Sequence, residues 1–110
     1  MNHYYNAPDL GKFGEIAKGN AELAKKFFDW YGAVFADGAL SAREKSLIAL
    51  AVAHAVQCPY CIDAYANDSL KQGCSEEEMT EAVHVAAAIR GGASLVHGVQ
   101  MRNIVEKVSM

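Results

Sequence analysis

Two cysteines separated by two residues, Cys58 and Cys61, are the side chains of this sequence best suited to chemistry. Thiols at this spacing meet the geometric limits of a disulfide, so the pair can close and open reversibly. When such a pair stands at the start of a helix, backbone N–H groups and the helix dipole stabilise a thiolate there. The sequence therefore predicts thiol redox chemistry carried by this pair.

Two polar side chains flank the pair at a distance of one helical turn. His54 lies four residues before Cys58, where an imidazole could take up a thiol proton and hold the thiolate. The alternative is a buried histidine satisfied by a backbone carbonyl. Tyr65 lies four residues after Cys61, and its hydroxyl could donate to a thiolate or to a bound peroxide. The alternative for Tyr65 is packing in the core.

Three further side chains with reactive groups lie later in the sequence. His84 and His97 stand on either side of a double glycine, and either could fold back over the thiols. We count His97 among the candidate site residues. Cys74 follows a glycine and precedes a capping serine, a position more typical of an incidental cysteine than of a reactive one.

A metal site is the competing interpretation of the same residues. Cys58, Cys61, His54 and one more histidine could form a zinc site. A single CxxC with scattered histidines is a weak pattern for metal, however. We therefore predict neither a metal nor a cofactor.

The segment that leads into the pair decides between two architectures. Glutaredoxins carry the same tetrapeptide, but a thioredoxin-type fold needs a strand before it and a cis-proline opposite the disulfide. Here the alanine-rich segment 41–57 has Ser41 and Glu44 at capping-box spacing, which predicts a helix. The only prolines are Pro8 and Pro59, so the cis-proline loop is missing.

Capping residues, glycines and apolar spacing predict about six helices in one domain covering residues 1–110, an all-α bundle with the CxxC at the N-terminus of a helix. The expected elements are Leu10–Lys18 capped by Asp9, a helix from Asn20 to the stop at Asp37-Gly38, Ala42–Gln57, Pro59 to about Gln72 with Gly73 as its stop, a helix from the capping Ser75 to Arg90, and Ala93 to about Val108. Gly91-Gly92 is expected to mark a break or a close packing contact. The third of these helices is apolar nearly all round, which predicts a central, buried position.

Composition limits the partners. The formal net charge is −3 and there is no basic run, so we expect no nucleic acid. The longest apolar run, Leu47–Val56, is about half a membrane span, and Met1–Lys12 has no apolar signal region, so a soluble cytoplasmic protein is expected. Counted without the five tyrosines and with the nine glycines, apolar residues make up about 55% of the chain, against about 45–50% in an average domain counted in the same way. Self-association is the simplest outlet for this excess, and Tyr4-Tyr5 is one candidate contact.

From Ser41 to Gln100 the sequence resembles the carboxymuconolactone decarboxylase-like superfamily, in particular its alkylhydroperoxidase AhpD-like branch. The segments that carry the resemblance are Ala42-Arg43-Glu44-Lys45, Cys58-Pro59-Tyr60-Cys61 and Ala93-Ser94-Leu95-Val96-His97-Gly98. The whole chain, from Tyr4-Tyr5 through Phe27-Phe28-Asp29-Trp30-Tyr31-Gly32 to Val99-Gln100-Met101, is similar to the arsenosugar biosynthesis-associated peroxidase-like proteins.

This resemblance implies an all-helical fold assembled as trimers or hexamers. It also implies peroxide reduction by the CxxC pair, with Cys61 as the peroxidatic and Cys58 as the resolving residue. The helix dipole alone would favour Cys58 as the more acidic thiol, so the assignment of roles depends on the resemblance.

The sequence departs from the family pattern at the proton relay. Ser46 stands where the family has a glutamate, and Tyr65 and Tyr60 stand where it has histidines. The usual relay is therefore missing, and His54, Tyr65 and His97 are its candidate replacements.

The leading interpretation is a thiol-dependent hydroperoxidase or disulfide oxidoreductase. It would act on a hydroperoxide, be reset by an external dithiol or thioredoxin-like reductant, and work as a homo-oligomer. The alternative is an accessory protein without peroxidase activity that holds a thiophilic species such as As(III) between its vicinal thiols. A third interpretation, a ring-lactone decarboxylase, is disfavoured because that branch needs no CxxC.

Overall fold

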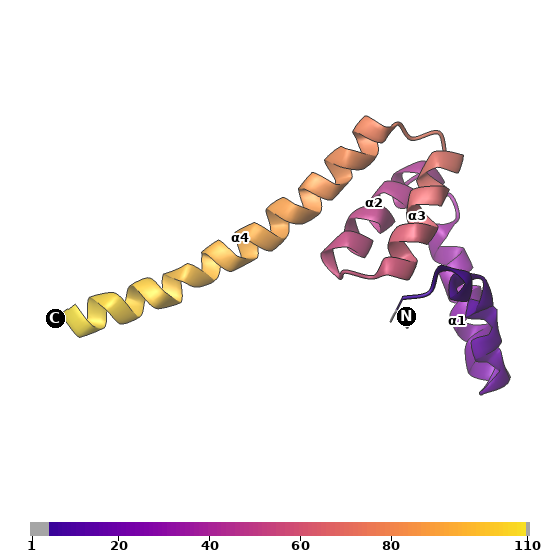
Figure 1. Cartoon of the computed structure of the whole chain (residues 1–110), viewed down its shortest axis with the longest axis horizontal. Helices are drawn as coiled ribbons and strands as arrows, with labels where there is room; N and C mark the ends of the chain where they lie inside the picture. Colours follow the sequence, from indigo (N-terminus) through magenta and orange to yellow (C-terminus); the bar gives the residue numbers. More distant parts are fainter. Residues whose placement is uncertain (1–4, 110) are drawn as a thin grey trace.

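The computed structural model describes residues 5–109, and within that range the chain folds into helices alone, with no strand (Figure 1). In chain order the elements are the 3₁₀ helix η1 (Ala7–Lys18) and the α-helices α1 (Ala21–Phe35), α2 (Ala42–Ala55), α3 (Pro59–Lys71) and α4 (Glu76–Ser109). The predicted all-α fold is confirmed, with five helices over this range where about six were expected. None of the described helices is long and apolar enough to cross a membrane.

Three helix starts follow the caps read from the sequence. Asn20 accepts a hydrogen bond from a backbone N–H in the first turn of α1. Ser41 and Glu44 form a reciprocal capping box at the start of α2, with N···O distances of 3.0 and 2.9 Å. Ser75 and Glu78 form a second box at the start of α4. Each cap satisfies N–H groups that a helix start leaves without a partner, so these boundaries are set locally.

The first helix differs from the prediction in type and in start. We expected an α-helix over Leu10–Lys18 with Asp9 as its cap. The structure instead forms a 3₁₀ helix that begins earlier, with Asn6 at the N-cap position and Asp9 inside the first turn. Pro8 explains the earlier start, because its fixed φ and missing N–H suit the first turn of a helix.

Small side chains let the helices approach one another around α2. It packs against α3 on one side and α4 on another. The buried side chains at these contacts are Ser46, Leu50 and Ala53 on α2, Ser69 on α3, Cys74 in the following loop and Ala86 on α4. The core of the single chain is therefore narrow and lies along α2.

The expectation that α2 is buried all round is wrong for the single chain. Ile48, Val52 and Val56 form a third face along α2 and just past its end, and they are 49%, 52% and 65% exposed. The two packed faces take up only part of the helix surface. The apolar pattern read from the sequence therefore exceeds what one copy of the chain can cover.

One uninterrupted helix, α4, replaces the two helices that were expected after Ser75. The predicted break at Gly91-Gly92 is wrong, and a Cβ built on either glycine would meet no atom within 4 Å. Two glycines weaken a helix by about 1 kcal/mol each but do not end it without a left-handed residue or a proline. The second half of α4 consequently projects away from the other helices (Figure 1).

Two polar contacts fix the first half of α4 along α2. Near the start of both helices, the guanidinium of Arg43 forms an ion pair with Glu78. This pair, together with the capping hydrogen bond from the Ser75 backbone, lowers the pKa of Glu78 from 4.5 to about 2. Further along, Arg90 donates to the backbone carbonyl of Ala55 at the last turn of α2. The contact between α2 and α4 thus extends over the full length of α2.

Candidate functional site

A tight turn between α2 and α3 presents the two cysteines. Gln57 is the only non-glycine residue with positive φ in the described part of the chain, at 56°. The N–H of Cys58 still reaches the carbonyl of Ala53 at 3.0 Å, which closes the end of α2. Pro59 then starts α3, where its missing N–H leaves no bond unmade. Left-handed backbone at a residue with a side chain costs free energy, so the turn is held by the packing of both helices.

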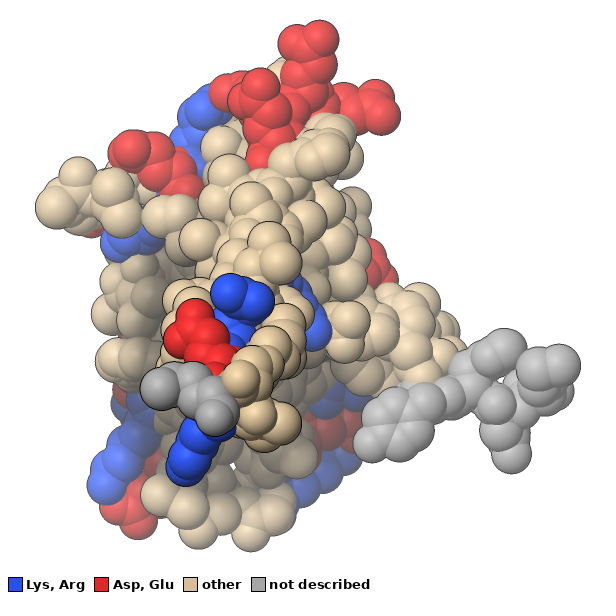
Figure 2. Space-filling model, turned by 90° about the vertical axis from the view of Figure 1, so that its left-hand side faces the viewer, with Lys and Arg blue, Asp and Glu red and all other residues tan. Residues whose placement is uncertain are grey.

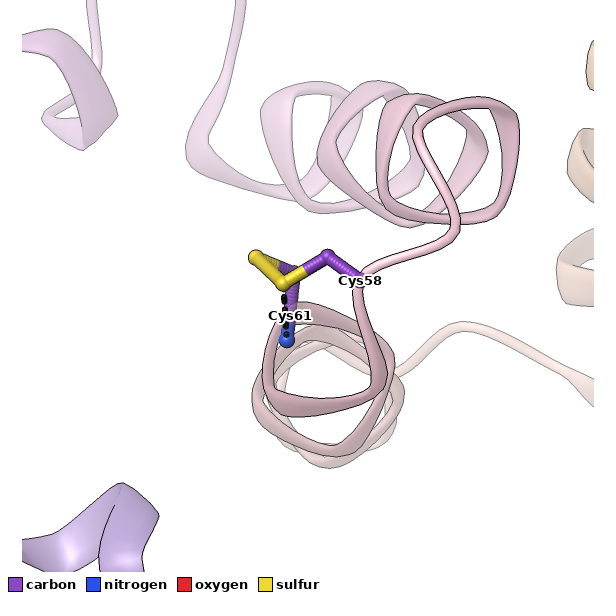
Figure 3. The surroundings of a disulfide bond; sticks show 2 residues. All are labelled: Cys58 and Cys61. Carbon is purple, nitrogen blue, oxygen red and sulfur yellow. Dashed lines mark hydrogen bonds between the residues drawn. A yellow bond between two sulfur atoms is a disulfide. The ribbon is translucent and has the colours of Figure 1, made fainter. Parts of the chain in front are cut away.

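Cys58 and Cys61 form a disulfide at the first turn of α3 (Figure 3). Their Cα atoms are 5.2 Å apart. Cys58 occupies the N-cap position, and its sulfur accepts a hydrogen bond from the backbone N–H of Cys61 at 3.2 Å. Both residues are half-buried. The predicted position of the pair, at a helix start between packed helices, is confirmed.

Both cysteines line an open cavity of about 880 Å³ between η1, α1 and α3. Its wall is mainly apolar and includes six aromatic residues, namely Phe13, Phe28, Tyr31, Phe35, Tyr60 and Tyr65. The charged side chains at its edge are Asp9, Asp68 and Lys71. The thiols therefore face a space that would accept an apolar molecule.

A second, smaller groove meets this cavity at Cys61. It runs over α1, α2 and α3, and its lining includes Ile48, Val52 and Val56 together with Cys61 and Tyr65. Cys58 is not among the residues that line it. Cys61 is thus reached from two sides and Cys58 from one.

Tyr65 is the predicted site residue that the fold brings to the thiols. It lines both hollows next to Cys61, and its ring stacks on Phe35 at 5.2 Å between centroids. The ring is therefore held by α1 while its hydroxyl remains available to a bound molecule. In the wall of the same cavity, the pKa of Tyr31 is raised, chiefly by burial and to a smaller extent by the negative charge of Asp68.

His54 lies beside the motif but on another side of it. Its Nδ1 lies 2.9 Å from the carbonyl oxygen of Leu50, one turn back along α2, so that nitrogen carries the proton. The ring lines a shallow hollow with Tyr5, Pro59 and Asp63, and neither cysteine belongs to that lining. This matches the alternative read from the sequence, a histidine satisfied by a backbone carbonyl, except that the ring is half-buried where a buried one was expected.

Neither histidine of α4 reaches the thiols of its own chain. His84 and His97 are exposed, and His97 lies 3.5 Å from the amide of Gln100 on the same helix. No cavity beside the disulfide is lined by either one in the part of the chain described by the structure. A role for His97 in the site of its own chain therefore has no geometric support.

Ser46 and Cys74 meet in the interior, at the opposite end of α2 and α3 from the disulfide. Ser46 donates to the carbonyl of Arg43, and its oxygen lies 3.8 Å from the sulfur of Cys74. Ser69 donates in turn to the carbonyl of Ser46. Ser46, at the family's glutamate position, is thus a packing residue. Cys74 is 5% exposed, so it is a buried thiol and no reactive loop cysteine.

The segment before η1 closes over α3 next to the motif. Tyr5 donates to Asp63 at 2.8 Å and packs edge-on against Tyr60 at 4.7 Å between centroids. The hydrogen bond to Asp63 raises the pKa of Tyr5. Tyr5 was expected at a partner subunit, but it packs on its own chain. Tyr4, the other half of that expectation, lies outside the described residues.

Sequence reasoning did not single out Asp68 or the aromatic wall of the cavity. Helical spacing could have predicted the position of Asp68, because it lies seven residues after Cys61 and three after Tyr65, on one face of α3. Phe28, Tyr31 and Phe35 repeat at the same spacing on α1. Among the described residues no group of three or more His, Cys, Asp or Glu side chains lies close enough together to hold a metal ion.

Most of this chain is similar to proteins that are already known. A model of the carboxymuconolactone decarboxylase family matches residues 21–101, from the start of α1 into the second half of α4. An uncharacterised protein of the cox locus of Paracoccus denitrificans is 38% identical over 95 residues, which are 86% of each chain. The crystal structure of a protein from Methanobacterium thermoautotrophicum superposes with a TM-score of 0.75 at 35% identity, covering 78% of this chain and 97% of that one.

Proposed function

Since the chain belongs to the carboxymuconolactone decarboxylase family, we propose that it acts as a thiol-dependent hydroperoxidase of the alkylhydroperoxidase-like branch. The observation that supports this most is the position of Cys58 and Cys61, which stand at a helix N-terminus on an open apolar cavity. A disulfide there is exposed to small molecules and within reach of a second thiol reagent. Neither a metal nor a cofactor takes part in the proposal.

The proposed reaction consumes one hydroperoxide and two thiols. The Cys61 thiolate attacks the terminal oxygen of the hydroperoxide, the O–O bond breaks, and the leaving alkoxide takes up a proton to become an alcohol. Cys61 is now a sulfenic acid. The sulfur of Cys58 attacks it, so that the disulfide forms and water leaves. An external dithiol, such as a thioredoxin-like protein, then returns two electrons and two protons and is itself oxidised.

Access supports Cys61 as the attacking residue. Its sulfur lies where the aromatic cavity and the groove over α2 meet, whereas Cys58 lines the cavity alone. The hydrogen bond from the Cys61 N–H to the Cys58 sulfur favours a thiolate at Cys58. A resolving thiol that is already ionised closes the disulfide quickly. The two observations are therefore compatible with the assigned roles.

Tyr65 is the proposed proton donor to the leaving oxygen. It lies next to Cys61 on both hollows, and its ring is fixed by Phe35. A tyrosine stays protonated at neutral pH and can therefore give a proton to an alkoxide. His54 remains a candidate base only through its Nε2, because Nδ1 is engaged with Leu50.

The wall of the cavity favours organic hydroperoxides over hydrogen peroxide. Aromatic rings from α1 and α3 surround the thiols, and such a surface binds alkyl or aryl groups by burial of apolar area. Hydrogen peroxide offers no apolar group to such a wall. We expect cumene hydroperoxide to give the higher kcat/KM of the two.

A peroxide-consumption assay with dithiothreitol as reductant tests the proposal. The wild-type protein is expected to consume cumene hydroperoxide catalytically, and Cys61→Ser to lose turnover entirely. Cys74→Ser is the matched control, since it removes a thiol far from the cavity and should keep turnover. Absence of turnover in the reduced wild type would refute the proposal. Tight binding of phenylarsine oxide by that inactive protein would then support the accessory, As(III)-holding function.

A further inference from the structure

A carboxylate without an ion pair lies in the wall of the cavity that holds the thiols. Asp68 on α3 is half-buried and lines this cavity together with the aromatic residues of α1 and α3. No ion pair joins it to a cationic side chain within the described residues. Several other carboxylates have such a partner, and Figure 2 shows acidic and basic side chains together at several places on one face of the molecule. Asp68 therefore brings a negative charge to the cavity that its own chain leaves uncompensated.

The two other charged side chains of the cavity do not cancel this charge. Asp9 lies 3.8 Å from Lys12, so the carboxylate of η1 has a cation of its own. Lys71 is exposed one turn beyond Asp68 on α3, and no ion pair joins the two. A half-buried charge interacts with a bound molecule more strongly than an exposed one, because water screens it less. The charge that a ligand in the cavity meets most strongly is therefore that of Asp68.

A row of aromatic rings connects Asp68 with the thiols. Tyr31, Phe35 and Tyr65 all line the cavity, and successive centroids in this row are 5.0 and 5.2 Å apart. Tyr65 stands at the end next to Cys61. Tyr31 stands at the other end, where the charge of Asp68 contributes to the raised pKa of its hydroxyl. Asp68 follows Cys61 by seven residues, which is about 10 Å along an α-helix.

Rings beside an uncompensated carboxylate are suited to one class of ligand. The faces of aromatic rings carry negative partial charge and attract organic cations, above all ammonium groups that have lost part of their water. A carboxylate adds the full opposite charge for such a group. An uncharged molecule gains nothing from Asp68, and an anion is repelled by it. The cavity wall thus combines the two kinds of group that recognise an ammonium ion attached to an apolar body.

We propose that this cavity binds an organic cation, an alkyl- or arylammonium ion, with its nitrogen at Asp68 and its apolar body along the row of rings toward Cys61. Asp68 is then the residue that determines specificity. The preferred substrate is a hydroperoxide whose ammonium group lies about 10 Å from the O–O bond. This statement about the substrate rests on the proposed peroxidase function, whereas binding of the cation does not.

Isothermal titration calorimetry of the full-length chain, with its disulfide closed, tests the cation site. The probe is phenethylammonium, and phenethyl alcohol and phenylacetate are its uncharged and anionic counterparts of similar size. The dissociation constant of the cation is expected to be at least about tenfold lower than those of both counterparts. Asp68→Asn should raise the dissociation constant of the cation about tenfold and leave that of phenethyl alcohol unchanged.

Asp9→Asn is the matched control, since it removes the same charge from the edge of the same cavity. It should change the dissociation constant of the cation by less than about twofold, because Lys12 already compensates this carboxylate. A cation that binds no more tightly than phenethyl alcohol would overturn the proposal. Equal weakening by Asp9→Asn and Asp68→Asn would also overturn it, because the attraction would then come from the general charge of the cavity.

Peroxide turnover tests the statement about the substrate. In the reduced wild type, para-aminomethyl cumene hydroperoxide should have a kcat/KM about tenfold above that of cumene hydroperoxide, and Asp68→Asn should abolish this difference. Turnover without such a preference would contradict the inference and leave the proposed peroxidase function standing. Binding of phenethylammonium by a protein that turns over neither hydroperoxide would support the cation site and refute the peroxidase function.

Discussion

The two motif cysteines owe their special character to backbone geometry. Cys58 caps α3 and receives the N–H of Cys61, and the sharp turn at Gln57 points both residues at the cavity. No histidine lines that cavity in the described part of the chain. At the scale of single residues, the site is thus a dithiol at a helix N-terminus, with a tyrosine beside it in place of an imidazole.

The role of Tyr65 is tested by removing its hydroxyl. Tyr65→Phe keeps the stacking on Phe35, so the fold should be unchanged. We expect kcat/KM for cumene hydroperoxide to fall about a hundredfold, the low end of general-acid effects, because the leaving alkoxide loses its proton donor. The rate of iodoacetamide alkylation of the thiols, which needs no such donor, should stay the same. Unchanged peroxide turnover would make Tyr65 a packing residue only.

His54 is tested by the alkylation rate of the motif thiols as a function of pH. If His54 were the base for the motif thiols, as its spacing in the sequence allows, His54→Ala would slow this reaction at pH 7 by roughly tenfold. The structure places the ring on another hollow, with Nδ1 bound to Leu50, so we expect a change of less than about threefold. A tenfold slowing would return His54 to the mechanism as the base.

The sequence predicted those features of the site that depend on local backbone geometry. The position of Cys58 and Cys61 at a helix start follows from Pro59 and from the capped helix before it, and Tyr65 follows from helical spacing. The side on which His54 points was not predictable, because it depends on the left-handed turn at Gln57. Residues other than glycine rarely adopt a left-handed conformation, so nothing in the local sequence predicts this turn.

At the scale of elements, α2 is the helix on which the others depend. It contacts α1, α3 and α4, and it carries Leu50, the largest fully buried side chain in the described core. We expect Leu50→Ala to lower the free energy of unfolding by about 2–5 kcal/mol, since it leaves a cavity between three helices. Leu70→Ala, at a residue 59% exposed on α3, should change it by less than about 0.5 kcal/mol. Urea unfolding followed by circular dichroism measures both.

The ion pair between Arg43 and Glu78 makes the contact between α2 and α4 sensitive to acid. The pKa of Glu78 is lowered from 4.5 to about 2, chiefly by its hydrogen bonds from Arg43. Stabilisation by this carboxylate is therefore complete above pH 4.5 and is lost as the pH falls toward 2. We expect the urea midpoint of Glu78→Gln to drop less over this range than that of the wild type. An equal drop in both proteins would contradict the assignment, and salt should weaken the effect because both side chains are 40% exposed.

Helix boundaries were predictable where a side chain caps them. Asn20, Ser41 and Ser75 each set a helix start through their own hydrogen bonds, and Gly73, with φ of 81°, ends α3 as expected. The expected break at Gly91-Gly92 failed, because weak propensity alone does not end a helix whose neighbours are strong helix formers. The 3₁₀ form of η1 was not predicted from the local sequence pattern; η1 contacts α1 and α3.

At the scale of the whole molecule, composition predicted that apolar surface would be left exposed, but it did not predict which helix faces would expose it. The excess of hydrophobic residues predicted self-association, and the structure shows apolar side chains exposed on the free half of α4 and on the third face of α2. The packing of the other helices decides which faces of a helix stay exposed. The apolar pattern of α2 carries no information on that packing, so it predicted a helix buried on every side.

The central claim, that Cys61 reduces hydroperoxides and Cys58 resolves it, is tested most directly by a single oxidation followed by mass spectrometry. One equivalent of cumene hydroperoxide should convert the reduced wild type to the form with the Cys58–Cys61 disulfide, with the loss of two hydrogens. In Cys58→Ser the same treatment should leave one added oxygen at Cys61 that dimedone traps as a sulfenic acid. Cys61→Ser should remain unmodified. A dimedone adduct at Cys58 in that variant, or a wild type that the peroxide leaves reduced, would contradict the account.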